Sequence, residues 1–252
     1  MAIEHILGLI ISILSNALAS FAGGGGSLVL MSGLILMMPS TSYLVILALV
    51  KTSAAVMTAS SGTLHLNKQK LDWKMIATLF FPGLIGIIIS TYLVQYKIEE
   101  GILISAIPFL LLGIVLYLIF NRRIGIEKNR TDVFTRMEYL EAGIFSFFLS
   151  VANGMIAGLG TLFVAYFVIR FRTSYIQTIA YMMISGAVIN IVQATYLVWA
   201  VDLDLILLGM VILGSFFGSI VGTKLQYKMG NRFVKPAALS MMSGLSLLMV
   251  LS

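Results

Sequence analysis

The chain contains no cysteine in its 252 residues, which excludes disulfides, thiolate metal sites and cysteine nucleophiles. Charge is also scarce: 10% of the residues are charged, whereas a typical soluble domain has roughly 25%. Hydrophobic residues make up 60% of the chain. Such a chain cannot form the polar surface that a soluble domain needs. We therefore predict an all-α integral membrane protein whose solvent is the lipid bilayer.

Two further absences concern the ends and the partners of the chain. The stretch Met1–His5 lacks the basic residues of a secretory signal, and no clear cleavage site ends the first apolar run, so we expect this run to be retained as a helix. The net charge of +6 comes from Lys and Arg in short loops between apolar runs, where membrane orientation explains them better than nucleic-acid binding.

Apolar runs predict ten helical segments, two of which are too short to span a membrane. In the first half they are Ile3–Ala22, the short Ser27–Met38, Tyr43–Leu64, Lys74–Gln95 and Ile102–Phe120. In the second half they are Glu138–Ala157, the short Thr161–Ile169, Ser174–Val198, Leu205–Gln226 and Val234–Leu251.

The two halves resemble each other. A shift of 132 residues places Tyr43 on Tyr175 and Gly86 on Gly218, and a shift of 134 places Gly24 on Gly158. We therefore predict a first membrane repeat in residues 1–120, a linker in 121–137 and a second membrane repeat in 138–252.

The basic loops predict the orientation, because Lys and Arg in short loops concentrate on the cytoplasmic side. The loop after Leu64, the linker and the loop after Gln226 are basic, whereas the Trp199–Asp204 loop has no Lys or Arg. This pattern places the linker in the cytoplasm of a multi-pass protein of the cell membrane. It also makes the two repeats inverted relative to each other, each with a glycine-broken helix hairpin and three transmembrane helices.

Glycine turns precede both short segments, Gly23–Gly26 in the first half and Gly158-Leu159-Gly160 in the second. Consecutive glycines weaken a helix, so each turn predicts a break within the membrane, followed by a half-helix. The N-termini of two opposed half-helices would present free N–H groups and positive dipole ends to an anion near the midplane. Close helix packing at the glycines is the alternative.

Lys51 lies near the middle of an apolar run, with no Asp or Glu at a comparable depth. A cation there should face a partner or a water-filled cavity, and an exchangeable anion could be that partner; snorkelling to an interface is the alternative. Thr58 and Gln193 are polar at similar depths, where they could form interhelical hydrogen bonds or line the site. The predicted substrate-binding residues are Gly24, Gly25, Gly26, Ser27, Lys51, Thr52, Ser53, Asn153, Gly158, Gly160, Thr161, Ser185 and Asn190.

Enzymatic chemistry finds little support. The chain has no HExxH motif and no paired intramembrane carboxylates, so we predict no catalytic residue, no metal and no cofactor. We expect His65, Asp72 and Asp204, which lie in or near loops, to be solvated rather than part of a proton path.

The sequence resembles the sulfite exporter TauE/SafE family of membrane transporters. The resemblance covers nearly the whole chain and is carried by the helix running into Gly23–Gly26, the returning apolar stretch and the basic loop before Leu71-Asp72-Trp73. It implies transport of a small sulfur-containing or organic anion such as sulfite, thiosulfate or a sulfonate. We therefore predict a secondary transporter of a small anion, with an anion channel or a non-transporting membrane scaffold as alternatives. The coupling proton or ion, the direction of transport and the oligomeric state stay open.

Overall fold

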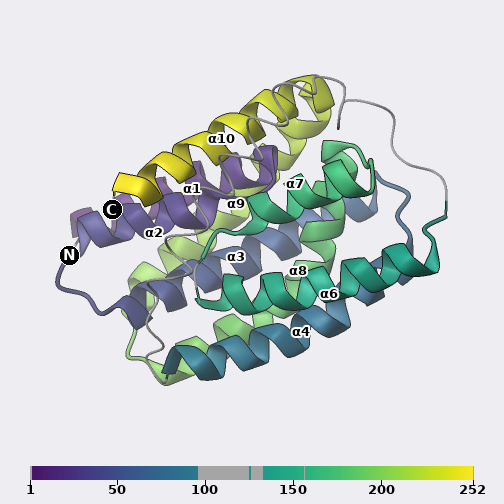
Figure 1. The fold of residues 1–252 in the computed structure, drawn as a ribbon. Helices are drawn as coiled ribbons and strands as arrows, with labels where there is room; N and C mark the ends of the chain where they lie inside the picture. Colours follow the sequence, from purple (N-terminus) through teal and green to yellow (C-terminus); the bar gives the residue numbers. More distant parts are fainter. Residues whose placement is uncertain (1, 96–124, 126–132, 156, 252) are drawn as a thin grey trace.

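The structure is a computed structural model that describes residues 2–95, 125, 133–155 and 157–251. All regular structure in these residues is helical (Figure 1). The first half contains α1 (Ala2–Ala22), α2 (Gly26–Met37), α3 (Tyr43–Leu66) and α4 (Trp73–Gln95). The second half contains α6 (Arg136–Met155), α7 (Gly160–Arg170), α8 (Tyr175–Ala200), α9 (Leu205–Met229) and α10 (Asn231–Leu251).

Five of these helices, α1, α3, α4, α8 and α9, are long and apolar enough to cross a membrane. The helices α2 and α7 are apolar but short, with 12 and 11 residues. The boundaries lie within a few residues of those predicted, so the prediction of a multi-pass, all-helical membrane protein is confirmed. The predicted segment Ile102–Phe120 and nearly all of the linker lie outside the described residues.

Small residues bring two pairs of helices into close contact. Along α9, a Cβ added to Gly218 would lie 2.3 Å from the carbonyl oxygen of Ile13 in α1. Along α4, a Cβ added to Gly86 would lie 2.5 Å from the carbonyl oxygen of Phe147 in α6. Backbone contact of this kind is how helices associate in lipid, where the solvent provides no hydrophobic driving force.

The helices α3 and α8 form the centre of the bundle and run antiparallel. Asn190 Nδ2 in α8 lies 3.5 Å from Thr58 Oγ1 in α3. Further along α3, a Cβ on Gly62 would contact the earlier residue Met183 of α8. The helix α9 runs parallel to α3, as the bonds Ser53–Ser215 (2.7 Å) and Thr223–Ser61 (2.9 Å) show.

One end of the bundle is basic. Contacts between helices assemble it: Arg170 of α7 forms a 2.8 Å salt bridge with Glu141 of α6, and the Ile176 N–H of α8 donates to Asn231 Oδ1 of α10 at 2.9 Å. Among the described residues, every Lys and Arg except Lys51 lies at or near this end; they are Lys68, Lys70, Lys74, Arg136, Arg170, Arg172, Lys224, Lys228, Arg232 and Lys235.

The opposite end contains both chain ends (Figure 1). There His5 Nε2 lies 2.7 Å from Asp204 Oδ2, which joins the start of α1 to the N-cap of α9. This hydrogen bond, with those from the N–H groups of Leu207 and Ile206, keeps the pKa of Asp204 below its ordinary value. Asp204 is exposed, as predicted.

Replacing Gly218 by alanine should destabilise the protein, because the new methyl group would push α9 away from the backbone of α1. We expect a loss of about 1–3 kcal/mol, the range of overpacked sites, measured as a lower midpoint of thermal unfolding in detergent. Gly209→Ala is the matched control, since a Cβ at Gly209 on the same helix meets nothing within 4 Å. Equal midpoints for the two variants would contradict the packing described above.

Candidate functional site

Two glycine turns set the starts of α2 and α7. Gly23, Gly24 and Gly25 all have positive φ angles, as does Gly158. Residues with a side chain rarely adopt such angles, so glycine permits the sharp reversal from α1 into α2. The N-cap positions are Gly25 and Leu159, and neither provides a side-chain capping bond. The helices therefore begin one residue earlier than predicted, and Ser27 and Thr161 do not cap them.

The two turns contact each other. A Cβ on Gly24 would lie 2.6 Å from the backbone nitrogen of Thr161, and one on Gly158 would lie 3.1 Å from the backbone nitrogen of Leu28. The tip of each short helix thus packs against the turn that precedes the other. Because the first N–H groups of a helix have no intrahelical acceptor, this contact gathers unsatisfied donors from two helices in one place.

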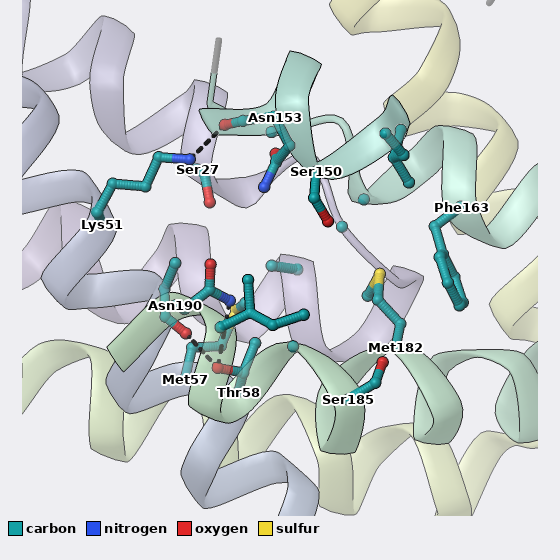
Figure 2. A pocket seen from close by; sticks show the side chains of 18 of the residues that line it. Ser27, Lys51, Met57, Thr58, Ser150, Asn153, Phe163, Met182, Ser185 and Asn190 are labelled. Atoms are coloured by element: carbon teal, nitrogen blue, oxygen red, sulfur yellow. Dashed lines mark hydrogen bonds between the residues drawn. The ribbon is translucent and has the colours of Figure 1, made fainter. Parts of the chain in front are cut away.

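A cavity of about 100 Å³ lies beside the tips. Figure 2 shows Lys51, Ser27, Asn153 and Ser150 on one side and Asn190, Thr58 and Ser185 on the other. The cavity is lined by Ala19, Gly24, Gly25, Ser27, Lys51, Ala54, Met57, Thr58, Ser146, Leu149, Ser150, Asn153, Gly158, Gly160, Phe163, Met182, Ser185, Gly186, Ile189 and Asn190.

Lys51 is 2% exposed and lies on the cavity wall. Its ammonium group donates a hydrogen bond to the backbone carbonyl of Asn153, in the last turn of α6 (Figure 2). The last carbonyls of a helix lack intrahelical donors and form the negative end of its dipole, which makes them a natural partner for a cation. Lys51, for which the sequence offers no Asp or Glu at the same depth, therefore has a protein partner in the backbone and also lies on a cavity wall.

Two more side chains hold the same end of α6. The Tyr43 hydroxyl donates to the carbonyl of Met155 at 2.9 Å, and Gln193 Nε2 donates to the carbonyl of Gly154 at 3.0 Å. With Lys51, these groups satisfy three consecutive carbonyls. Gln193 therefore forms an interhelical bond and does not line the cavity, which was one of the two roles considered for it.

The cavity keeps donors that are not used elsewhere. Figure 2 shows the side-chain nitrogen of Asn153 directed into the cavity, while its oxygen accepts a bond from the Leu159 N–H at 3.2 Å. The hydroxyls of Ser27 and Ser150 form no hydrogen bond with another described residue. Lys51 and the Asn153 amide nitrogen offer only donors to a ligand, and the hydroxyls of Ser27 and Ser150 can either donate or accept.

Four predicted binding residues lie off the cavity wall. Gly26 packs against α1, where its Cβ would lie 2.2 Å from the Ser15 carbonyl oxygen. The Thr52 hydroxyl bonds to the Ala48 carbonyl of its own helix at 2.8 Å. Ser53 faces α1 and α9, and Thr161 is buried without contributing to the wall.

The cavity also contains polar residues that the sequence reasoning did not include, Ser146 and Ser150 in α6. Their spacing was a usable signal, because Ser146, Ser150 and Asn153 recur at the interval of one helical turn and share a face. In an apolar helix, a stripe of small polar side chains indicates either helix packing or a cavity wall, and the sequence does not separate the two.

His65 differs from expectation. It is fully buried at the end of α3, and its Nδ1 lies 2.7 Å from the Tyr227 hydroxyl. The prediction that it is solvated was wrong, because α9 continues past it and covers it. Asp72 is half-buried and accepts a hydrogen bond from the Tyr139 hydroxyl.

Comparison with known proteins shows which family has this architecture. The searches of curated proteins and of solved structures found no match. The family model described as Sulfite exporter TauE/SafE matches residues 8–249, almost the whole chain. The family is one of membrane transporters, in agreement with the apolar helices and the broken helix pairs. The chain belongs to the sulfite exporter TauE/SafE family.

Proposed function

We propose that the protein is a secondary transporter of a small anion, which binds in the cavity beside the tips of α2 and α7 and crosses the membrane by alternating access. One observation carries the proposal: two helix N-termini without side-chain caps meet at a cavity whose wall also contains the only intramembrane cation of the described residues, Lys51. Helix N-termini attract anions through their free N–H groups and their dipole.

The balance of donors and acceptors supports an anion. Several carbonyl groups near the cavity already accept hydrogen bonds. Those of Asn153, Gly154 and Met155 accept from side chains. That of Ala19 accepts from the N–H groups of the following glycine turn, Gly23 and Gly24. The donors on Lys51, Asn153, Ser27 and Ser150 remain available to a ligand. An anion accepts hydrogen bonds and donates few, so it complements this wall better than a cation would.

The size of the cavity supports a small substrate. At about 100 Å³ it is well below the roughly 300–1,000 Å³ of sites for drug-sized ligands. Opposite the donors, the wall includes Met57, Met182 and Ile189. A small sulfur oxyanion such as sulfite or thiosulfate, or a short sulfonate, fits both the volume and the donors, in keeping with the family.

We further propose that the halves are inverted repeats. Gly218 packs against the Ile13 carbonyl, and Gly86 packs against the Phe147 carbonyl. Gly86 is the counterpart of Gly218 by the shift of 132 residues, and Ile13 is the counterpart of Phe147 by the shift of 134. Thr58 also contacts its own counterpart, Asn190. Reciprocal contacts of this kind are expected of a two-fold axis. Since the counterparts α3 and α8 are antiparallel, that axis would lie in the membrane plane, as in inverted-repeat transporters.

The gathering of cations at one end supports a cytoplasmic position for that end, and so for the linker, in a cell membrane. Since α2 and α7 run from their shared contact toward opposite ends, their combined length of about 35 Å, at 1.5 Å per residue, would place the tips near the midplane.

Replacing Lys51 by methionine should lower thiosulfate uptake into proteoliposomes by about 10- to 100-fold, the value of one charge-assisted hydrogen bond. Lys51→Arg should retain part of the uptake, because it keeps the cation. Lys68→Met, in the loop at the basic end, is the control and should transport normally. Uptake by Lys51→Met at the unmodified level would remove Lys51 from the site.

Replacing Gly24 by alanine should weaken thiosulfate binding, because the methyl group would separate the two tips. Gly230→Ala is a matched control: Gly230 also has a positive φ, but a Cβ there meets nothing within 4 Å. Both variants carry about 1–2 kcal/mol of backbone strain, so both should lose stability, but Gly24→Ala alone should lose affinity in a calorimetric titration. Loss of affinity in both variants would mean that the tips have no special role.

Counterflow with the purified protein tests the function as a whole. Proteoliposomes loaded with unlabelled thiosulfate should accumulate labelled thiosulfate transiently above its equilibrium level, because a carrier exchanges substrate across the membrane. A channel would show flux without such accumulation, and a scaffold would show none. Binding of cations or neutral solutes only would overturn the proposal of an anion site.

A further inference from the structure

Three polar residues of the second half line the cavity although their counterparts in the first half do not. In the second half, Ser146 and Ser150 of α6 and Ser185 of α8 all lie on the wall. Their counterparts by the shifts of 134 and 132 residues are Ser12, Asn16 and Ser53. None of these three lies on the wall, although the same helix faces carry them.

In the first half, Asn16 and Ser53 form hydrogen bonds with each other and with Ser215 instead of lining the cavity. We call Ser12, Asn16 and Ser53 the closed set. Asn16 Nδ2 donates to Ser53 Oγ at 2.9 Å and lies 3.2 Å from Ser215 Oγ, and the two serine hydroxyls are 2.7 Å apart. Asn16 is 4% exposed and the serines 1% or less. The helices α1, α3 and α9 are thus joined by side-chain hydrogen bonds at this position. At the equivalent position in the second half, Ser146 and Ser185 bond only to backbone carbonyls, those of Leu79 and Tyr181, and both line the cavity with Ser150.

Two buried residues, Ser12 of the closed set and Thr161 at the start of α7, carry hydroxyls without a partner in the described part of the chain. Ser12 Oγ and Thr161 Oγ1 are buried and have no hydrogen-bond partner among the described residues. Thr161 is the counterpart of Ser27, whose hydroxyl faces the cavity. A buried hydroxyl without a partner is costly in an apolar surrounding. Both groups would be satisfied if water or an anion reached them.

The cavity extends from the tips of α2 and α7 toward the basic end, since Ser146 and Ser150 precede Asn153 on a helix that starts there. Asn16 lies on the other side of the tips, since it precedes the wall residue Ala19 on α1. Ser53 lies between the wall residues Lys51 and Ala54 on α3 but faces away from the cavity, toward α1 and α9.

From this asymmetry we infer that Ser12, Asn16, Ser53 and Thr161 form the closed half of the anion path and line it in the opposite-facing state. This inference rests on the proposed function. In that state α1, α3 and α9 separate at the Asn16–Ser53–Ser215 bonds, while Ser146, Ser150 and Ser185 pack as their counterparts do now. The hydroxyls and the amide of the closed set then hydrogen-bond to the anion on its way to the non-basic side.

The absence of cysteine makes this testable with single thiols. In proteoliposomes, Ser150→Cys should react with a membrane-impermeant maleimide added on the basic side and be protected by thiosulfate. Ser53→Cys should react from the other side only while thiosulfate is being exchanged. Ser20→Cys is the matched control: Ser20 is fully buried in the same α1–α3–α9 interface, but its counterpart Gly154 is not on the cavity wall, so it should stay unreactive.

A wedge tests the coupling between the two sides. Asn16→Trp would hold α1 away from α3 and α9, so it should favour the opposite-facing state and reduce labelling of Ser150→Cys from the basic side by about tenfold. Ser53→Phe provides the same wedge from α3 if Asn16→Trp does not fold. The inference is overturned if neither wedge changes this labelling, or if Ser53→Cys stays unreactive during exchange. Failure of thiosulfate to protect Ser150→Cys would instead refute the anion site itself.

Discussion

A helix that ends inside a bilayer leaves backbone groups without partners, and the site depends on how this chain treats those groups. The last carbonyls of α1 and α6 have no donor within their own helices, but other groups bond to them. On α6 these groups are Lys51, Gln193 and Tyr43. On α1 they are Gln226 and the N–H groups of the glycine turn. The starts of α2 and α7 carry free N–H groups, and these have no side-chain cap. Satisfying the acceptors while leaving the donors open is the arrangement on which the proposed anion site depends.

In the proposed mechanism, Lys51 would have two competing roles. Its bond to Asn153 fixes the last turn of α6 and balances the negative end of that helix. Asn153 in turn holds the start of α7 through its side-chain oxygen, so one lysine connects α3 to both members of the broken pair. An anion entering the cavity would attract the same ammonium group. Binding would then weaken the bond that holds α6, which provides a physical link between occupancy and helix movement.

The sequence was sufficient for the described helices and for the glycine turns between them, because apolar length and consecutive glycines reflect helix length and backbone freedom. Lys51, Ser27 and Asn153 were found for the same reason: polar groups are rare in this chain and therefore conspicuous. The sequence could not show which face of a helix an individual polar group occupies. Ser53 and Ser185 are counterparts in equivalent helices, yet one bonds to α1 and α9 and the other lies on the cavity wall. His65 looked terminal, and only the length of α9 buries it.

That difference between counterparts is what a repeat should produce when it works as a transporter. Two halves in one environment would pack alike, but a path closed on one side and open on the other forces them into different arrangements. Lys51 breaks the symmetry permanently, because its counterpart is Met183. A single cation that reaches the shared centre from one helix can serve the anion in both states without a second charge to desolvate, and a second buried lysine would add a cost of about 2.5–3.5 kcal/mol. In the proposed inverted-repeat transporter, the asymmetry in charge and the near-symmetry in backbone are compatible, since the two halves of the backbone would exchange arrangements while Lys51 stayed with the substrate.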